Sequence, residues 1–72
     1  MRAKIRLDTL RDVNEFVRIC SGIGAGVYIT DGKGLCVSAK SILGAMYALE
    51  FDELWCECDE DIYRYIERFV VL

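Results

Sequence analysis

The residues of this chain that could do chemistry are its cysteines and serines, because it contains no histidine. Cys56 and Cys58 form a C-x-C pair, a spacing that places both side chains on one face of a strand. A zinc site would need paired C-x-x-C knuckles on tight turns. The pattern therefore favours buried core thiols, and a metal site or a disulfide remains the alternative. The cysteines concerned are Cys20, Cys36, Cys56 and Cys58.

The closely spaced glycines Gly22, Gly24 and Gly26 are a second pattern to consider, because glycine-rich loops can bind nucleotides. A dinucleotide-binding fingerprint follows a strand and opens a helix. Here the glycines follow a predicted helix and lead into a predicted strand, so they indicate a helix stop and a turn. We find no acid/base pair, catalytic triad or metal set with supporting spacing. We therefore expect neither an enzyme nor a cofactor.

Composition narrows the class of protein. The 72 residues are 54% apolar and 29% charged, with a net charge of -3, which predicts a single folded domain over residues 1–72. A chain with this charge has no field to attract nucleic acid. Its apolar runs are far shorter than the ~20 residues that span a bilayer, and it shows no leader segment. We expect a cytoplasmic protein without a membrane partner.

The elements that must position these residues follow from hydrophobic periodicity. Alternating polarity predicts strands at residues 3–8, 26–30, 35–39 and 52–58. Apolar residues at three- and four-residue steps predict helices at 9–22, from 41 to about 49, and at 61–72. Thr9 and Ser41 are expected as N-caps, and the Asp31-Gly32 dipeptide indicates a hairpin. The order is βαββαβα.

This order predicts an α+β fold with a four-stranded antiparallel sheet and three helices on one face. The expected helix stripes are Leu10, Val13, Phe16, Val17 and Cys20; Ile42, Ala45, Met46 and Leu49; and Ile62, Tyr65 or Ile66, and Phe69. Strand residues expected to face the helices are Ile5, Leu7, Val27, Ile29, Leu35, Val37, Ala39, Leu54, Cys56 and Cys58. Those expected on the open face are Lys4, Arg6, Tyr28, Thr30, Cys36, Ser38, Trp55 and Glu57.

The stretch "DGKGLCVSAKSILGAM", residues 31–46, together with the element order, carries a family resemblance. The chain resembles HPr, the histidine-containing phosphocarrier protein family of the bacterial sugar phosphotransferase system. The matching motifs are Asp31-Gly32-Lys33, Lys40-Ser41-Ile42 and Gly44-Ala45-Met46. The resemblance implies an HPr-like open-faced two-layer sandwich in which the second and fourth strands are neighbours.

The chain departs from the family where the family does its chemistry. Family members carry Gly-x-His-x-Arg-Pro where the first helix begins. In this chain Thr9 falls near the histidine position, Arg11 near the arginine, and Asp12 at the proline. A carrier needs an imidazole, whose phosphoramidate is labile, whereas a threonine ester is too stable to pass on. We therefore expect a degenerate active-site region without phosphohistidine carrier activity.

The resemblance also implies a regulatory and a docking site. It places Ser41 on the serine that a kinase modifies in many HPr proteins, and Ile42, Leu43 and Met46 on the partner-docking surface. The alternatives are a simple helix cap for Ser41 and core packing for the apolar side chains, particularly Ile42, Ala45 and Leu49.

Two aromatic residues stand out on the expected open face. Tyr28 and Trp55 are expected there, either packed on the stems of Lys4 and Arg6 or exposed for self-association.

The expected function follows from these residues. We expect an HPr-like regulatory or partner-binding protein, a monomer or weak homodimer, switched by phosphorylation of Ser41. A ferredoxin-like small-ligand-binding or dimerisation module is the alternative, because such domains share the βαββαβ order.

Overall fold

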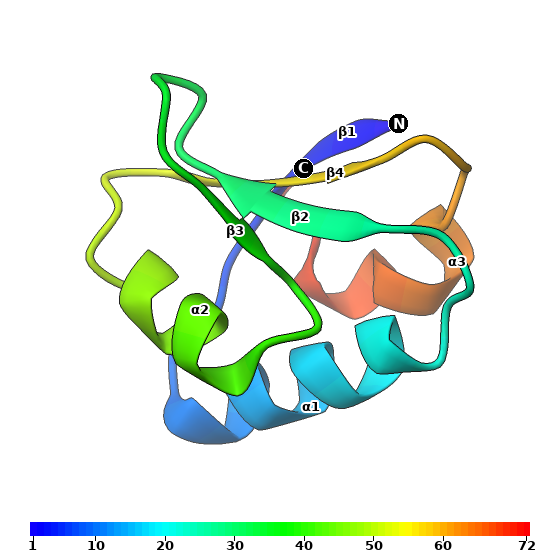
Figure 1. Ribbon diagram of the computed structural model, residues 1–72, viewed down its shortest axis with the longest axis horizontal. Coiled ribbons are helices and arrows are strands. Elements are labelled where there is room, and N and C mark those ends of the chain that lie inside the picture. The colour runs from blue at the N-terminus through cyan, green and yellow to red at the C-terminus, as the bar shows by residue number, and fades with distance from the viewer.

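A computed structural model describes residues 1–72 as two layers, with a sheet on one side and helices on the other (Figure 1). The strands are β1 (Arg2–Ile5), β2 (Val27–Thr30), β3 (Cys36–Ser38) and β4 (Leu54–Cys58). The helices are α1 (Leu10–Ser21), α2 (Ile42–Ala48) and α3 (Tyr63–Ile66), followed by a 3-10 turn, η1 (Glu67–Phe69). None of these helices has the length and apolar character needed to cross a lipid bilayer.

The sheet is antiparallel throughout, with the strand order β1-β4-β2-β3. The last strand therefore lies in the middle, where it pairs Cys56 with Ala3 on one side and with Ile29 on the other. All the helices cover the same face (Figure 1). The expectation of a small α+β domain with a four-stranded antiparallel sheet and three helices on one face is confirmed.

The core lies between the sheet and α1. Phe16 is fully buried on α1 and meets the ring of Phe69 edge-on, with ring centroids 5.2 Å apart. The expected stripe on α1 is buried apart from its first residue, Leu10, which is 57% exposed. The remaining buried core residues include Ile5, Leu7, Val13, Val17, Cys20, Val27, Ile29, Ala39, Ala45, Ala48, Cys56, Cys58, Ile62 and Ile66.

The predicted helix at 61–72 is wrong over most of its length. Only one turn, α3, is α-helical, and after η1 the chain is extended, with Val70 bridged to Ile5. The main chain of Arg6 donates to Phe69, and that of Val71 donates to Lys4. These bonds to β1 and the β-branched Val70-Val71 pair favour an extended end over further helix. Of the alternatives Tyr65 and Ile66, Ile66 is the buried one.

Two residues of the predicted strands differ from the expectation in their burial. Thr30 was expected to be exposed but is buried, because its hydroxyl donates to the Leu35 carbonyl and accepts from the Gly32 amide under the β2–β3 loop. Leu35 was expected to be buried but is 46% exposed, because it belongs to that loop and not to β3. The loop covers residues 31–35 and is held by Asp31, whose carboxylate accepts from the amides of Lys33 and Leu35.

Candidate functional site

The candidate site is built on α2, whose local sequence explains both its start and its orientation. Ser41 caps the helix, since its hydroxyl accepts from the Gly44 amide at 3.0 Å. A Cβ added at Gly44 would lie 3.3 Å from the Ser38 carbonyl oxygen, so α2 packs closely against the end of β3. The buried residues of the helix are Ala45 and Ala48. Because only these small side chains face the core, the large ones point outward.

The outward side of α2 is apolar. Ile42 is 47% exposed, Leu43 79% and Met46 41%; we call these three residues the docking face. The alternative that they pack in the core is wrong, because the alanines occupy that position. A contiguous apolar surface of this kind on a helix is typical of a protein contact. Tyr47 and Leu49, also exposed on this segment, extend it.

Sequence reasoning missed Tyr47. It also placed Ile42, Met46 and Leu49 in the buried stripe with Ala45, and all three are exposed. A signal that identifies the buried side was present, namely the pair Ala45 and Ala48 at a three-residue spacing. Small residues let a helix approach a neighbouring element closely, so a side with two alanines next to Gly44 is the better candidate for burial in so short a helix.

Ser41 itself is exposed and reachable at the start of α2. No acidic residue lies in the first turn of the helix, so nothing on α2 repels an added phosphate. The preceding Lys40 is not free to pair with it, because its ammonium group donates to the Ile23 carbonyl at 2.6 Å.

The region matching the family's active site lies at the start of α1 and is satisfied by its own hydrogen bonds. The Thr9 hydroxyl accepts from the Asp12 amide, and the Asp12 carboxylate accepts from the Asp8 amide. Thr9 is thus the N-cap expected from the sequence. Arg11 is exposed and in no ion pair. The structure places Thr9, Arg11 and Asp12 on one turn, where they do not form a pair of nucleophile and general base.

Tyr28 and Trp55 do not stack on each other. Strand register pairs Tyr28 with Glu57, and it pairs Trp55 with Thr30. Trp55 is half-buried beneath the guanidinium of Arg2, 4.7 Å from the ring centroid, with the ammonium of Lys4 at 6.0 Å. Of the two basic residues expected beside these rings, Lys4 lies near Trp55, whereas Arg6 pairs with Asp8.

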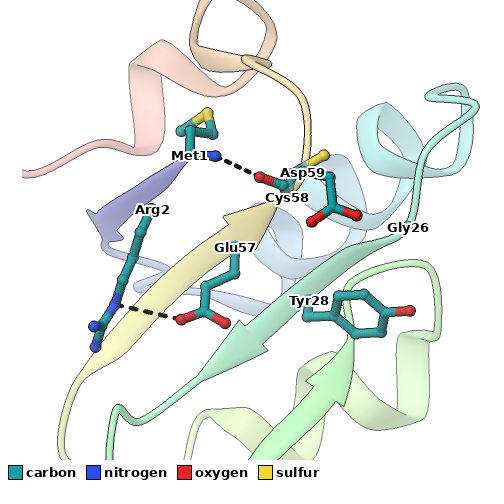
Figure 2. A pocket seen from close by; sticks show the side chains of 7 residues that line it. All are labelled: Met1, Arg2, Gly26, Tyr28, Glu57, Cys58 and Asp59. Atoms are coloured by element: carbon teal, nitrogen blue, oxygen red, sulfur yellow. Dashed lines mark hydrogen bonds and ion pairs between the residues drawn. The ribbon is translucent and has the colours of Figure 1, made fainter.

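Tyr28 is 46% exposed and borders a shallow pocket of about 370 Å³ at one end of the sheet (Figure 2). Its ring lies over Gly26, where an added Cβ would come within 2.9 Å of the tyrosine oxygen. Three of the four charged groups that line this pocket have partners, since Arg2 pairs with Glu57 at 3.4 Å and the Met1 amino group donates to the Cys58 carbonyl, while the Asp59 carboxylate has none (Figure 2). The side-chain groups left free in this pocket are the Asp59 carboxylate and the Tyr28 hydroxyl.

The cysteines divide into a buried and an exposed class. Cys20, Cys56 and Cys58 are buried and Cys36 is exposed, and all four are free thiols, so the expectation of buried thiols holds for three of them. Burial first, and then the neighbouring thiols Cys56 and Cys58, raise the pKa of Cys20 to about 12. Burial and Cys58 raise the pKa of Cys56 to about 11. Neither thiol is therefore a nucleophile near neutral pH.

Comparisons of the chain with protein families, with curated proteins and with solved structures found no match.

Proposed function

We propose that this chain is an HPr-like cytoplasmic protein that binds a protein partner through the docking face of α2 and has no phosphohistidine carrier activity. The exposure of Leu43 at 79% on a helix anchored by alanines is the observation that carries the docking role. The absence of histidine is what excludes the carrier role.

The sheet supports the HPr-like part of the proposal. The resemblance requires the second and fourth strands to be neighbours, and β2 pairs with β4 over four residue pairs, from Val27 with Cys58 to Thr30 with Trp55. The segment with the strongest motif match, residues 31–46, also supplies the β2–β3 loop, the Ser41 cap and the docking face.

We expect the chain to bind the general phosphotransferase enzyme that feeds HPr without accepting its phosphoryl group. An apolar contact centred on Leu43 should be weakened at least about tenfold by Leu43→Glu, because burying the carboxylate at the contact is costly. Isothermal titration calorimetry measures the affinity. Incubation with the enzyme and phosphoenolpyruvate should leave no acid-labile adduct on the chain.

Tyr65→Glu is the matched control, since Tyr65 is 55% exposed on α3, away from the docking face. It should bind as the wild type does, and both variants should keep the wild-type melting temperature. An acid-labile phosphoryl adduct would refute the non-carrier role. Equal binding by Leu43→Glu and wild type, or no binding by either, would refute the docking role. In that case a thermal-shift screen with small ligands addresses the ferredoxin-like alternative.

We further propose that Ser41 is a phosphorylation switch for this surface. HPr kinase with ATP should transfer one phosphoryl group to the Ser41 hydroxyl, with release of ADP, and the ester should be stable in acid. The free amides at the start of α2 favour the added charge, so the fold should survive, while the dianion beside Ile42 should weaken docking. Intact-mass measurement should show no product for Ser41→Ala and full product for Ser38→Ala. Equal labelling of Ser41→Ala would exclude this site.

A further inference from the structure

The two edges of the sheet differ in how their main-chain groups are satisfied. The register of β1 with β4 leaves the outward groups of Lys4 and Arg6 unpaired within the sheet. The C-terminal segment takes both: the Arg6 amide donates to the Phe69 carbonyl at 2.8 Å, and the Val71 amide donates to the Lys4 carbonyl at 2.9 Å. The chain therefore covers part of its own β1 edge, at Lys4 and Arg6.

The β3 edge has no such cover. The Asp31 amide donates to Leu35 and the Ala39 amide donates to Val27, so the residues of β3 that bond to β2 are the odd-numbered ones. By the alternation of antiparallel pairs, the main-chain groups of Cys36 and Ser38 point away from β2. Only the Ser38 carbonyl has a partner there, the Ser41 amide at 3.3 Å. The Cys36 amide and carbonyl and the Ser38 amide are open.

This edge also lacks two of the features that normally keep sheets apart, namely charged residues and proline. Proteins protect exposed edges with charged residues or proline. Between Gly34 and Leu49 the only charged residue is Lys40, whose ammonium group is held by the Ile23 carbonyl, although the whole chain has 9 basic and 12 acidic residues. In a two-fold contact a charged residue close to the axis lies near the same charge of the other copy, which repels it. A surface without charges is therefore suited to meeting itself.

We propose that the β3 edge pairs antiparallel with the β3 edge of a second copy of this chain, about a two-fold axis beside Val37. In this register the Ser38 amide of each copy donates to the Cys36 carbonyl of the other, and the sheets become one. The contact goes beyond the proposed function, because it uses the main chain of β3 and not the docking face. With three residues per strand, the dimer is weak and depends on concentration.

The register fixes where the exposed thiols lie. Cys36 and its copy occupy diagonal positions on the same face of the joined sheet, with Cα atoms about 7 to 8 Å apart. A bis-maleimide with a spacer of similar length should link them, because each thiol adds across one maleimide double bond and nothing is released. The other cysteines are buried, so Cys36 alone reacts. On a denaturing gel the cross-linked dimer should migrate at twice the 8.2 kDa mass of the single chain.

Two substitutions of one residue test the pairing itself. Ser38→Ala and Ser38→Pro both remove the hydroxyl, but only proline removes the outward amide, and neither takes a bond from β2. Because symmetry doubles the loss, Ser38→Pro should cross-link at least about tenfold more slowly than Ser38→Ala, which should match the wild type. Exchange of the Ser38 amide should also slow with concentration, whereas exchange of the Val37 amide should not.

Circular dichroism and thermal melting must show both variants folded, and Leu43→Glu should leave the cross-linking rate unchanged. Equal rates for Ser38→Pro and Ser38→Ala would overturn the pairing, as would protection of the Ser38 amide that does not change with concentration. A rate lowered in Leu43→Glu alone would place the contact on the docking face and would equally overturn it.

Discussion

Phe16→Ala is expected to lower the free energy of unfolding by about 3 to 5 kcal/mol. Phe16 is fully buried at the centre of α1, and its ring meets Phe69 at an interplanar angle of 86°. The substitution leaves a cavity beside Phe69, from which the chain continues to the Val70 bridge with β1. Since a domain of this size has a stability of only about 4 to 11 kcal/mol, the variant should lose a large share of that stability and melt at a clearly lower temperature.

Urea denaturation followed by circular dichroism measures this loss. Leu10→Ala is the matched control, because Leu10 lies on the same helix but is 57% exposed, so its change should be within about 0.5 kcal/mol. A loss below about 1 kcal/mol for Phe16→Ala would mean that the core between α1 and the sheet is not packed as described.

The second large effect is a loss of stability at alkaline pH. The native pKa values of Cys20 and Cys56 are raised by burial from 9.0 to about 12 and about 11. Above pH 9 the unfolded chain releases these thiol protons while the native chain retains them, so the native state binds more protons and stability falls as pH rises. These two thiols leave the free energy of unfolding unchanged below pH 9. Toward pH 11 they lower it progressively, by on the order of a few kcal/mol.

Chemical denaturation at a series of pH values from 8 to 11 measures the slope. Cys20→Ala should flatten the slope, because it removes the thiol with the larger shift, even though the variant starts from a lower stability. Cys36→Ala should keep the wild-type slope, since Cys36 is exposed on β3. Identical slopes for Cys20→Ala and wild type would show that Cys20 does not cause the loss.

The local elements were predictable where short-range chemistry determines them. Thr9 and Ser41 are caps because a hydroxyl at that position accepts from the amide three residues on, a contact within one turn. The C-x-C pair lies on one side of β4 because side chains alternate along any strand. Neither conclusion depends on what lies across the core.

Predictions failed where two faces or two conformations were locally similar. On α2 both the Ile42 side and the Ala45 side are apolar, and close packing on β3 at Gly44 selects the alanines. Thr30 alternates as an open-face residue should, yet the loop at 31–35 folds over it. In each case the deciding contact comes from another element.

The sequence by itself determined that no phosphohistidine can form, because that depends on residue types alone. It also determined the α+β class, since periodicity is a property of each segment. Only the tertiary structure decided that residues 70–71 extend along β1 and leave the β3 edge open. A segment that could continue as a helix becomes extended when a strand elsewhere in the chain offers unpaired main-chain groups, and local sequence does not record that partner.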